Sequence, residues 1–275
     1  FARRYNEPDT DEVLGNPDIE VNGEPIESEF QGVELSFDGN GVAQFGVRYL
    51  DAGSVGLEAR YEGSEVTDDA GLTLAGRDDF AAAPQGLCVE TDWACETNDA
   101  SCQADNNPTA GDAFDLNVTA VGWASGANEN LCEGNPVTPN FEMQGIELSH
   151  QLFAPAPSEG ILGVLGRNEY DHLQSSDGQT TISEQSVSEV GVFEFSAIPP
   201  EGSYFGETVP RGVSSPAGRF IPEQFDVTAM NGELLPPCSA SQPFGYVGEP
   251  IAFNSDEPVI FEITAVNAKG VITEN

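Results

Sequence analysis

The chain has 275 residues, of which 47 are acidic and nine are basic, so its formal net charge at pH 7 is −38. A surface this acidic repels phosphate backbones, which argues against nucleic acid as a partner, and no apolar run approaches the roughly 20 residues of a membrane span. The 16 Phe, 30 Gly and 19 Pro favour packed cores joined by many turns, as in an all-β fold.

Residues 33–61 have the pattern of a β-meander. "VELSF" predicts a strand, "DGNG" predicts a turn that tolerates positive φ, and "VAQFGVRYL" predicts the next strand. "DAGS" then turns into "VGLEARY", and apolar residues alternate along these segments as a half-buried sheet requires. No segment predicts a helix that would be stable alone.

Five cysteines predict disulfide staples: Cys88, Cys95, Cys102, Cys132 and Cys238. The first three are seven residues apart in the polar stretch "CVETDWACETNDASC", a spacing that does not match the close Cys pairs of zinc ribbons. A loop this polar cannot be held by burial, so disulfides and an oxidising compartment are expected. Four cysteines can pair in three ways, which the sequence leaves open, and Cys238 is expected to be left over.

Two pairs of similar segments within the chain, which we call echoes, suggest a repeated domain. Residues 51–59, "DAGSVGLEA", resemble residues 189–197, "EVGVFEFSA", since both have an acid, a small apolar residue, a glycine and then alternating apolar positions. "LNVTAV" at 116–121 resembles "FEITAV" at 261–266, and each is followed by a second short match, "VTPN" or "ITEN". We interpret these echoes as a late and an early strand of one repeated β-sandwich.

The repeat predicts tandem immunoglobulin-like β-sandwich domains with disulfide-stapled loops. The domains expected are residues 1–78, incomplete at the N-terminal end; 79–210, larger and with the cysteine-rich loop; and 218–275, the start of a third domain that is incomplete at its C-terminal end. "PRGVSSPAGRF" is then a linker, in which Phe220 and the following Pro222 stiffen the joint and plug it against a neighbour. The alternative is an ordinary loop within one domain.

Catalytic residues cannot be identified from the sequence. His150 and His172 are predicted to be structural, because neither belongs to a nucleophile or metal motif. A glycosidase would need only two carboxylates, but nothing marks out a pair among so many acids. We therefore assign no catalytic or cofactor-binding residue and expect no enzyme; metal ligands stay undetermined.

Two weaker binding signals remain. Calcium could bridge the domains through acidic pairs near the expected boundaries, although a plain solvated surface is favoured: Asp9/Asp11, Asp68/Asp69 and Asp78/Asp79. Trp93 and Trp123 could form a sugar-binding platform, although core packing beneath the cysteine loop is the favoured interpretation.

Several motifs in the same order resemble a known family. "VRYLDAGSVGLEARY", "FDLNVTAV", "LSHQLFAP", "GRFIPEQFDVT" and "PPCSASQPFGYVGEPIAFN" are similar to the surface-protein family of the mannose-sensitive haemagglutinin (MSHA) pilus system, called MSHA biogenesis protein MshQ. The resemblance covers the chain from about residue 30 onwards. It implies a secreted or cell-surface protein of a Gram-negative bacterium that is associated with type IV pili, and it carries over no catalytic residue.

These observations together predict a non-enzymatic, structural or adhesive protein at the cell surface, associated with an MSHA-like type IV pilus. The pilus tip is one candidate position, and the sequence does not fix the place along the pilus. The partners expected are pilus subunits, other tip or assembly proteins, and surface glycans; an exposed sheet edge could bind another chain by strand addition. Two alternatives stay open: a carbohydrate-binding adhesin with Trp93 near its contact surface, and a calcium-dependent surface-layer protein.

Overall fold

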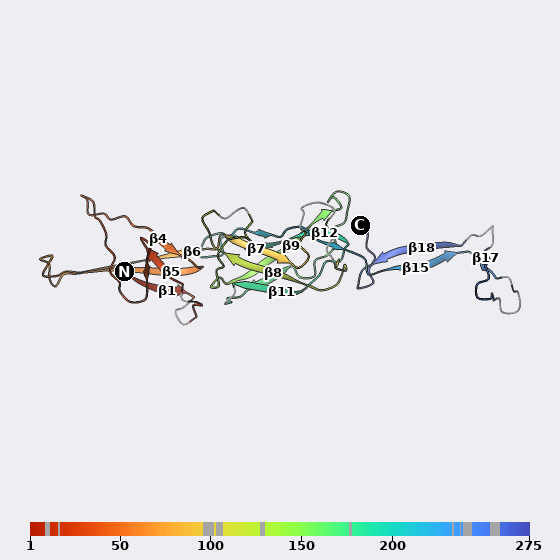
Figure 1. Cartoon of the computed structure of the whole chain (residues 1–275), viewed down its shortest axis with the longest axis horizontal. Helices are drawn as coiled ribbons and strands as arrows, with labels where there is room; N and C mark the ends of the chain where they lie inside the picture. Colours follow the sequence, from red (N-terminus) through yellow and green to blue (C-terminus); the bar gives the residue numbers. More distant parts are fainter. Residues whose placement is uncertain are drawn as a thin grey trace.

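The computed structural model describes residues 1–8, 12–15, 17–95, 102, 107–126, 130–175, 178–232, 234–236, 238, 244–253 and 259–275. The described residues form 18 strands and no helix, which confirms the predicted all-β class. Among the described residues, no helix is long and apolar enough to cross a membrane. Figure 1 shows the strands gathered into three groups along one long axis, with the N-terminus in one end group and β15, β17 and β18 in the other.

The first group, which we name the N-terminal module, contains two small antiparallel sheets. One has the order β1-β5-β6 and the other β3-β2-β4. Their bounds are β1 Ala2–Glu7, β2 Ile19–Val21, β3 Glu24–Ile26, β4 Val47–Tyr49, β5 Gly53–Glu62 and β6 Thr73–Ala82. β5 and β6 pair along their whole length, from Gly53 opposite Ala82 to Glu62 opposite Thr73.

The predicted meander at residues 33–61 is only partly correct. The "DGNG" turn forms, because the Asp38 carboxylate accepts the backbone N–H groups of Asn40 and Val42. "VELSF" forms no strand, and Phe37 makes only an isolated bridge to Ala43. Phe37 and Val42 are exposed, so this segment lacks the buried face that would fix a strand.

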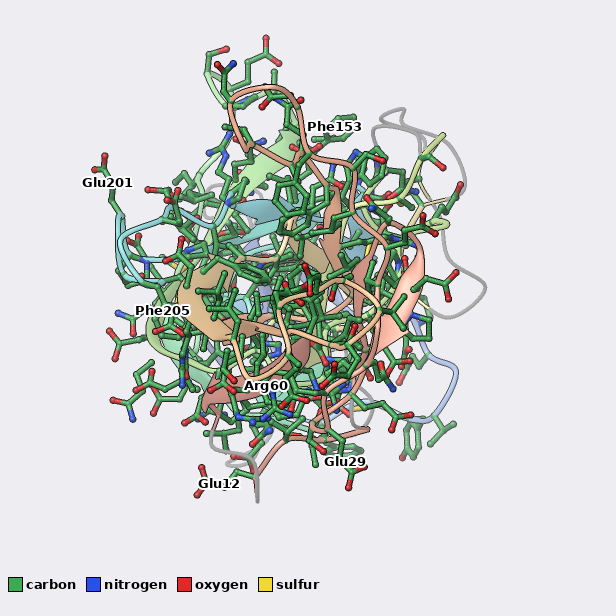
Figure 2. The ribbon with its side chains drawn as sticks, turned by 90° about the vertical axis from the view of Figure 1, so that its left-hand side faces the viewer. Glu12, Glu29, Arg60, Phe153, Glu201 and Phe205 are labelled. Carbon is green, nitrogen blue, oxygen red and sulfur yellow. A yellow bond between two sulfur atoms is a disulfide. The ribbon has the colours of Figure 1, made fainter. Side chains whose placement is uncertain are left out.

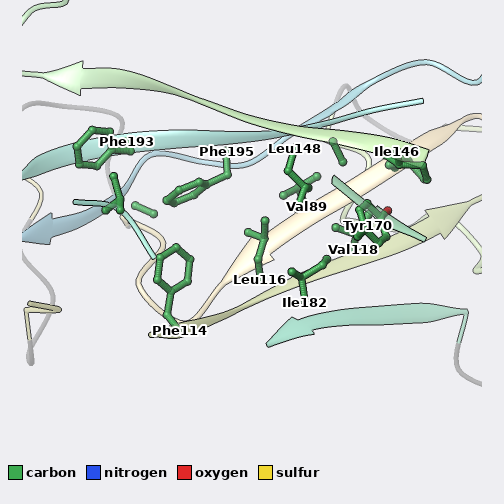
Figure 3. Packing of buried hydrophobic residues seen from close by; sticks show 14 of the residues in the cluster. Val89, Phe114, Leu116, Val118, Ile146, Leu148, Tyr170, Ile182, Phe193 and Phe195 are labelled. Atoms are coloured by element: carbon green, nitrogen blue, oxygen red, sulfur yellow. The ribbon is translucent and has the colours of Figure 1, made fainter. Parts of the chain in front are cut away.

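The second group, the middle sandwich, is two sheets packed face to face. One sheet has the order β11-β8-β7, and the other has β10-β9-β12-β13, with β14 also paired to β12. The bounds are β7 Gly86–Thr91, β8 Phe114–Val121, β9 Met143–Ala154, β10 Glu169–His172, β11 Gln179–Gln185, β12 Gly191–Ile198, β13 Gly212–Val213 and β14 Ala217–Phe220. Figure 3 shows side chains of both sheets, among them Leu116 of β8 and Phe195 of β12, filling the space between them.

The segment expected to be a linker is instead part of this sandwich. β13 and β14 both pair with β12, and Gly191 lies opposite Phe220. Phe220 is 1% exposed and contacts Phe114 and Phe193 with ring centroids 5.6 and 5.8 Å apart. The Gly, Pro and Ser residues of "PRGVSSPAGRF" mark a short irregular stretch between two strands, since buried backbone pairing overrides their turn preference here.

The third group, the C-terminal module, consists of two two-stranded ribbons. β15 (Gln224–Asn231) pairs with β18 (Ile260–Val266), and β16 (Leu234–Leu235) pairs with β17 (Ala252–Phe253). Both faces of the β15-β18 ribbon are solvent-exposed along much of its length, and Phe225 is 67% exposed. The final residue returns to lie beside the middle sandwich (Figure 1).

Candidate functional site: two equivalent joints between modules

Asp51 and Asn140 form a buried clasp between the N-terminal module and the middle sandwich. Asp51 lies just before β5, is 7% exposed, and accepts a hydrogen bond from the Ala52 N–H at 2.7 Å. Asn140 Nδ2 donates to Asp51 Oδ2 at 2.6 Å, and the Asn140 N–H donates to Asp51 Oδ1 at 3.2 Å. The Asn140 side chain also makes two hydrogen bonds to the backbone of Leu14. Its Oδ1 accepts the Leu14 N–H at 2.7 Å, and its Nδ2 donates to the Leu14 carbonyl at 2.9 Å.

Glu189 and Asn275 form the corresponding clasp between the middle sandwich and the C-terminal module. Glu189 lies just before β12 and is buried, and its carboxylate accepts the Glu274 N–H at 3.0 and 3.1 Å. The Asn275 N–H donates to Glu189 Oε1 at 3.4 Å. The Asn275 side chain also makes two hydrogen bonds to the backbone of one residue, as Asn140 does to Leu14. Its Oδ1 accepts the Ile161 N–H at 2.6 Å, and its Nδ2 donates to the Ile161 carbonyl at 2.8 Å.

Backbone bonds around the two clasps also correspond. Thr138 N–H donates to the Ala120 carbonyl at 2.9 Å, and Thr273 N–H donates to the Ala265 carbonyl at 2.9 Å. A further matched pair is Gln85 N–H to Val121 O at 2.8 Å and Glu223 N–H to Val266 O at 2.9 Å. The echoes therefore are equivalent strands, as the sequence predicted, and at each joint the late-strand echo of one module docks against the early-strand echo of the next.

A glycine follows each clasp carboxylate two residues later, and its position requires glycine. Gly53 has φ of +144° and Gly191 has φ of +136°, in the region that side chains rarely adopt. A Cβ at Gly53 would lie 2.5 Å from the Glu7 carbonyl oxygen, and one at Gly191 would lie 2.7 Å from that of Ala154. The glycine shared by "DAGSVGLEA" and "EVGVFEFSA" thus lets the neighbouring strand approach the start of β5 or β12.

Each joint contains a three-residue link with proline at its centre. Residues 83–85, Ala-Pro-Gln, connect β6 to β7, and residues 221–223, Ile-Pro-Glu, connect β14 to β15. Pro222 thus stands between two modules, as expected. Because proline fixes φ and the links are short, the chain has little freedom between the modules.

The electrostatics of the first joint follow from its burial. Burial raises the pKa of Asp51 above its ordinary value, and the hydrogen bonds from Ala52 and Asn140 oppose this shift. Each oxygen of the Asp51 carboxylate has a donor, which offsets the cost of placing a charge there. What this arrangement can do is positional: it holds two modules in one relative orientation.

Family comparisons match nearly the whole chain. The matching descriptions are "Domain of unknown function (DUF6701), first Ig-like domain" for residues 1–77, "DUF6701, second domain" for 83–183 and "DUF6701, third domain" for 189–275. The chain belongs to the DUF6701 family. No curated protein and no solved structure matches it.

The DUF6701 matches agree with the tandem immunoglobulin-like β-sandwich class predicted from the sequence. None of the three family descriptions mentions a pilus, so they do not test the resemblance to the MSHA system. A domain of unknown function also assigns no activity. The geometry of the joints is therefore the main guide to what this DUF6701 protein does.

The predicted disulfide staples form in the middle sandwich. Cys88 bonds Cys132 across a sequence separation of 44, and Cys95 bonds Cys102 across seven residues. Cys238 lies outside both bonds, as expected. Cys88, Glu90 and Cys132 lie close enough to bind a metal, but both sulfurs are already used by the disulfide.

Both histidines of this DUF6701 protein lie in or beside sheet strands. His150 is half-buried, with Nε2 3.0 Å from the Leu162 carbonyl. His172 is fully buried, with Nδ1 3.2 Å from the Tyr170 hydroxyl and its ring 5.1 Å from that of Phe141. Burial lowers the pKa of each, and it lowers that of His172 to about 4. These surroundings support the predicted structural role.

Acidification is expected to destabilise the middle sandwich through His172. The folded protein holds this side chain neutral down to about pH 4, whereas the unfolded chain protonates it near pH 6.5. The neutral His172 therefore contributes on the order of 3 kcal/mol to the free energy of unfolding above pH 6.5, and this contribution is lost as the pH falls from 6.5 to about 4. Denaturant unfolding at pH 7.5 and 4.5 should show a smaller loss for His172→Gln than for the wild type; equal losses would contradict this assignment.

The structure describes two of the three acidic pairs proposed for calcium. Asp9 and Asp11 lie outside the described residues. Asp69 accepts bonds from Tyr61 and Ser64 at 2.7 and 2.9 Å, and Asp79 pairs with Arg77 at 2.9 Å. Protein donors therefore already use two of these carboxylates, and calcium binding stays an untested prediction.

The two tryptophans have different surroundings. Trp93 packs edge-on against Phe114 and Phe220, with ring centroids 5.5 and 6.1 Å apart, so the favoured prediction of core packing is confirmed for it. Trp123 is 68% exposed, so the same prediction is wrong for Trp123. It directly follows β8 at the surface of the first joint, beside the short 83–85 link.

The clasp asparagines were not identified as functional residues from the sequence. The signal was present, because "VTPN" and "ITEN" end on Asn140 and Asn275 at matching positions. What was missing was the partner: the acid of each clasp belongs to the other echo, 89 residues before Asn140 in the first joint. The similarity between two segments shows that they have equivalent positions in the repeat, but it does not show which other segment each one contacts.

Proposed function

We propose that this chain is a non-enzymatic structural and adhesive part of a surface-exposed protein, associated with type IV pili of the MSHA kind. The observation that carries the proposal is the repeated joint. Two clasps, Asp51 with Asn140 and Glu189 with Asn275, connect successive modules in series. In each, a buried carboxylate accepts the asparagine backbone N–H, and the asparagine amide bonds the backbone of a second segment. An extended structural protein built from modules in series requires connections that hold each module in a fixed orientation to the next.

Other features of the chain suit mechanical and extracellular use. The Cys88–Cys132 disulfide closes a 44-residue separation and limits how far the middle sandwich can be extended. The proline links restrict bending between modules. Figure 2, viewed along the long axis, shows Glu12, Glu29 and Glu201 pointing outward, as expected for an acidic surface that keeps the protein soluble.

The association with a pilus is supported by the sequence resemblance. "GRFIPEQFDVT", its central motif, contains the end of β14, the Ile-Pro-Glu link and the start of β15. The motif that resembles the MSHA family is thus itself a joint between modules. On this proposal the protein lies at the surface of a Gram-negative cell, at the pilus tip, and its partners are pilus subunits or other tip and assembly proteins.

Immunogold electron microscopy of intact, piliated cells with an antibody against this chain tests the proposal. Gold at pilus ends is the expected result, and it should disappear from the cell periphery when the major pilin is deleted. Gold spread over the envelope, and unchanged by the pilin deletion, would overturn the pilus association. A strain that lacks the protein itself is the control for antibody specificity.

A further inference from the structure

A cleft of about 210 Å³ opens across the first joint. Residues 48–51 line it from the N-terminal module, and Trp123, Pro136 and Thr138 line it from the middle sandwich. Sites that enclose drug-sized ligands usually have about 300–1,000 Å³. This cleft is smaller, so it suits a single ring and not a large cofactor.

The side chains at the cleft combine an exposed aromatic surface with hydroxyl groups that have no partner. Trp123 is 68% exposed, which is unusual for so large an apolar side chain without a ligand or partner. The hydroxyl oxygens of Tyr49 and Thr138 are buried, and neither has a hydrogen-bond partner among the described residues. A buried polar atom without a partner costs about 1–3 kcal/mol, and both oxygens lie beneath the cleft surface, with less than 1 Å² exposed.

The second joint shows that these features are not needed to connect two modules. Ala268 stands where the first joint has Trp123, and its N–H donates to the Ala110 carbonyl at 2.9 Å. Val187 stands where the first joint has Tyr49, and its carbonyl accepts the Gly111 N–H at 2.7 Å. The hydroxyl of Thr273, the counterpart of Thr138, donates to the Ala265 carbonyl at 3.4 Å.

We propose that the cleft at the first joint binds a terminal neutral pyranose of a glycan. The apolar face of such a sugar would stack on the Trp123 indole, which is the exposed apolar surface at the cleft. Arg48, whose side chain is 61% exposed in a 3.4 Å pair with Glu20, supplies a hydrogen-bond donor to the sugar hydroxyls at the rim. The net charge of −38 disfavours sialylated or sulfated sugars.

This inference deepens the adhesive part of the proposed function but has its own test. Titration of the whole chain with chitotetraose, cellotetraose and galactobiose, followed by calorimetry and tryptophan fluorescence, should detect binding to at least one of these neutral sugars. Sialyllactose should bind at least tenfold more weakly. Trp123→Ala should lose about tenfold or more in affinity, and Trp123→Phe less.

Two further variants separate recognition from folding. Arg48→Gln removes the charged donor at the rim from an exposed position, so it should weaken binding a few-fold while the protein stays folded. Tyr246→Ala removes an equally exposed aromatic residue from the C-terminal module and should leave binding unchanged. The inference is overturned if none of the neutral sugars binds at millimolar concentration, or if Trp123→Ala binds as well as the wild type. Neither result would affect the pilus localisation, which the microscopy decides separately.

Discussion

A Phe220→Ala variant is expected to lose about 3–5 kcal/mol of unfolding free energy in the middle sandwich. Phe220 is 1% exposed and lies against Phe114, Phe193, Phe195 and Trp93. Removing its ring takes away buried apolar area and leaves a cavity that rigid neighbouring strands cannot fill. Because Trp93 contacts the ring, denaturant unfolding followed by tryptophan fluorescence reports on this core directly.

Phe225→Ala is the matched control, because Phe225 lies five residues further along the chain and is 67% exposed. Its truncation should change the unfolding free energy by about 0.5 kcal/mol or less. Similar small effects for both variants would show that β14 does not belong to the middle sandwich. In that case the segment would act as the flexible linker that its composition suggests.

An Asp51→Ala variant is expected to loosen the first joint and to cost about 2–4 kcal/mol. The carboxylate accepts bonds from Ala52 and from both the backbone and side chain of Asn140, all in a buried setting. Without it, these donors are left without a partner, and the orientation of the N-terminal module is no longer fixed. Hydrogen exchange should become faster around residue 140 and at the start of β5, while β7 and β8 change little.

A double-mutant cycle identifies the clasp itself as the cause. Asn140→Ala alone should have a similar effect, and the double variant should cost less than the sum of the two by about 0.5–3 kcal/mol. Asp115→Ala, which removes an exposed acid from β8, is the charge control and should change stability by about 0.5 kcal/mol or less. Additive costs for Asp51 and Asn140 would mean that the two residues act independently.

Local patterns along the chain predicted much of the architecture. Alternating apolar residues predicted strands such as β5, because a sheet with one buried face requires that period. The echoes predicted which strands are equivalent, and the polar cysteine loop predicted disulfides. These signals succeed because each depends on neighbours within one segment or on similarity between segments.

Long-range packing explains the failures. "VELSF" has a strand pattern, but no second layer covers Phe37, so no strand forms. The segment at 212–220 has a linker composition, but β12 offers free backbone groups that it completes as β13 and β14. Trp123 was expected in the core, yet its position just after β8 places it at the surface of a joint.

The sequence by itself determined the all-β class, the repeat, the presence of disulfides and the strongly acidic surface, since composition and periodicity are properties of the chain alone. Only the tertiary structure decided the contacts between modules: that Asp51 meets Asn140, that Glu189 meets the backbone of Asn275, and that a cleft opens beside Trp123 at the first joint. These contacts join residues about 85 or more positions apart. They form because each buried carboxylate must find donors, and the folded chain brings those donors from a different module.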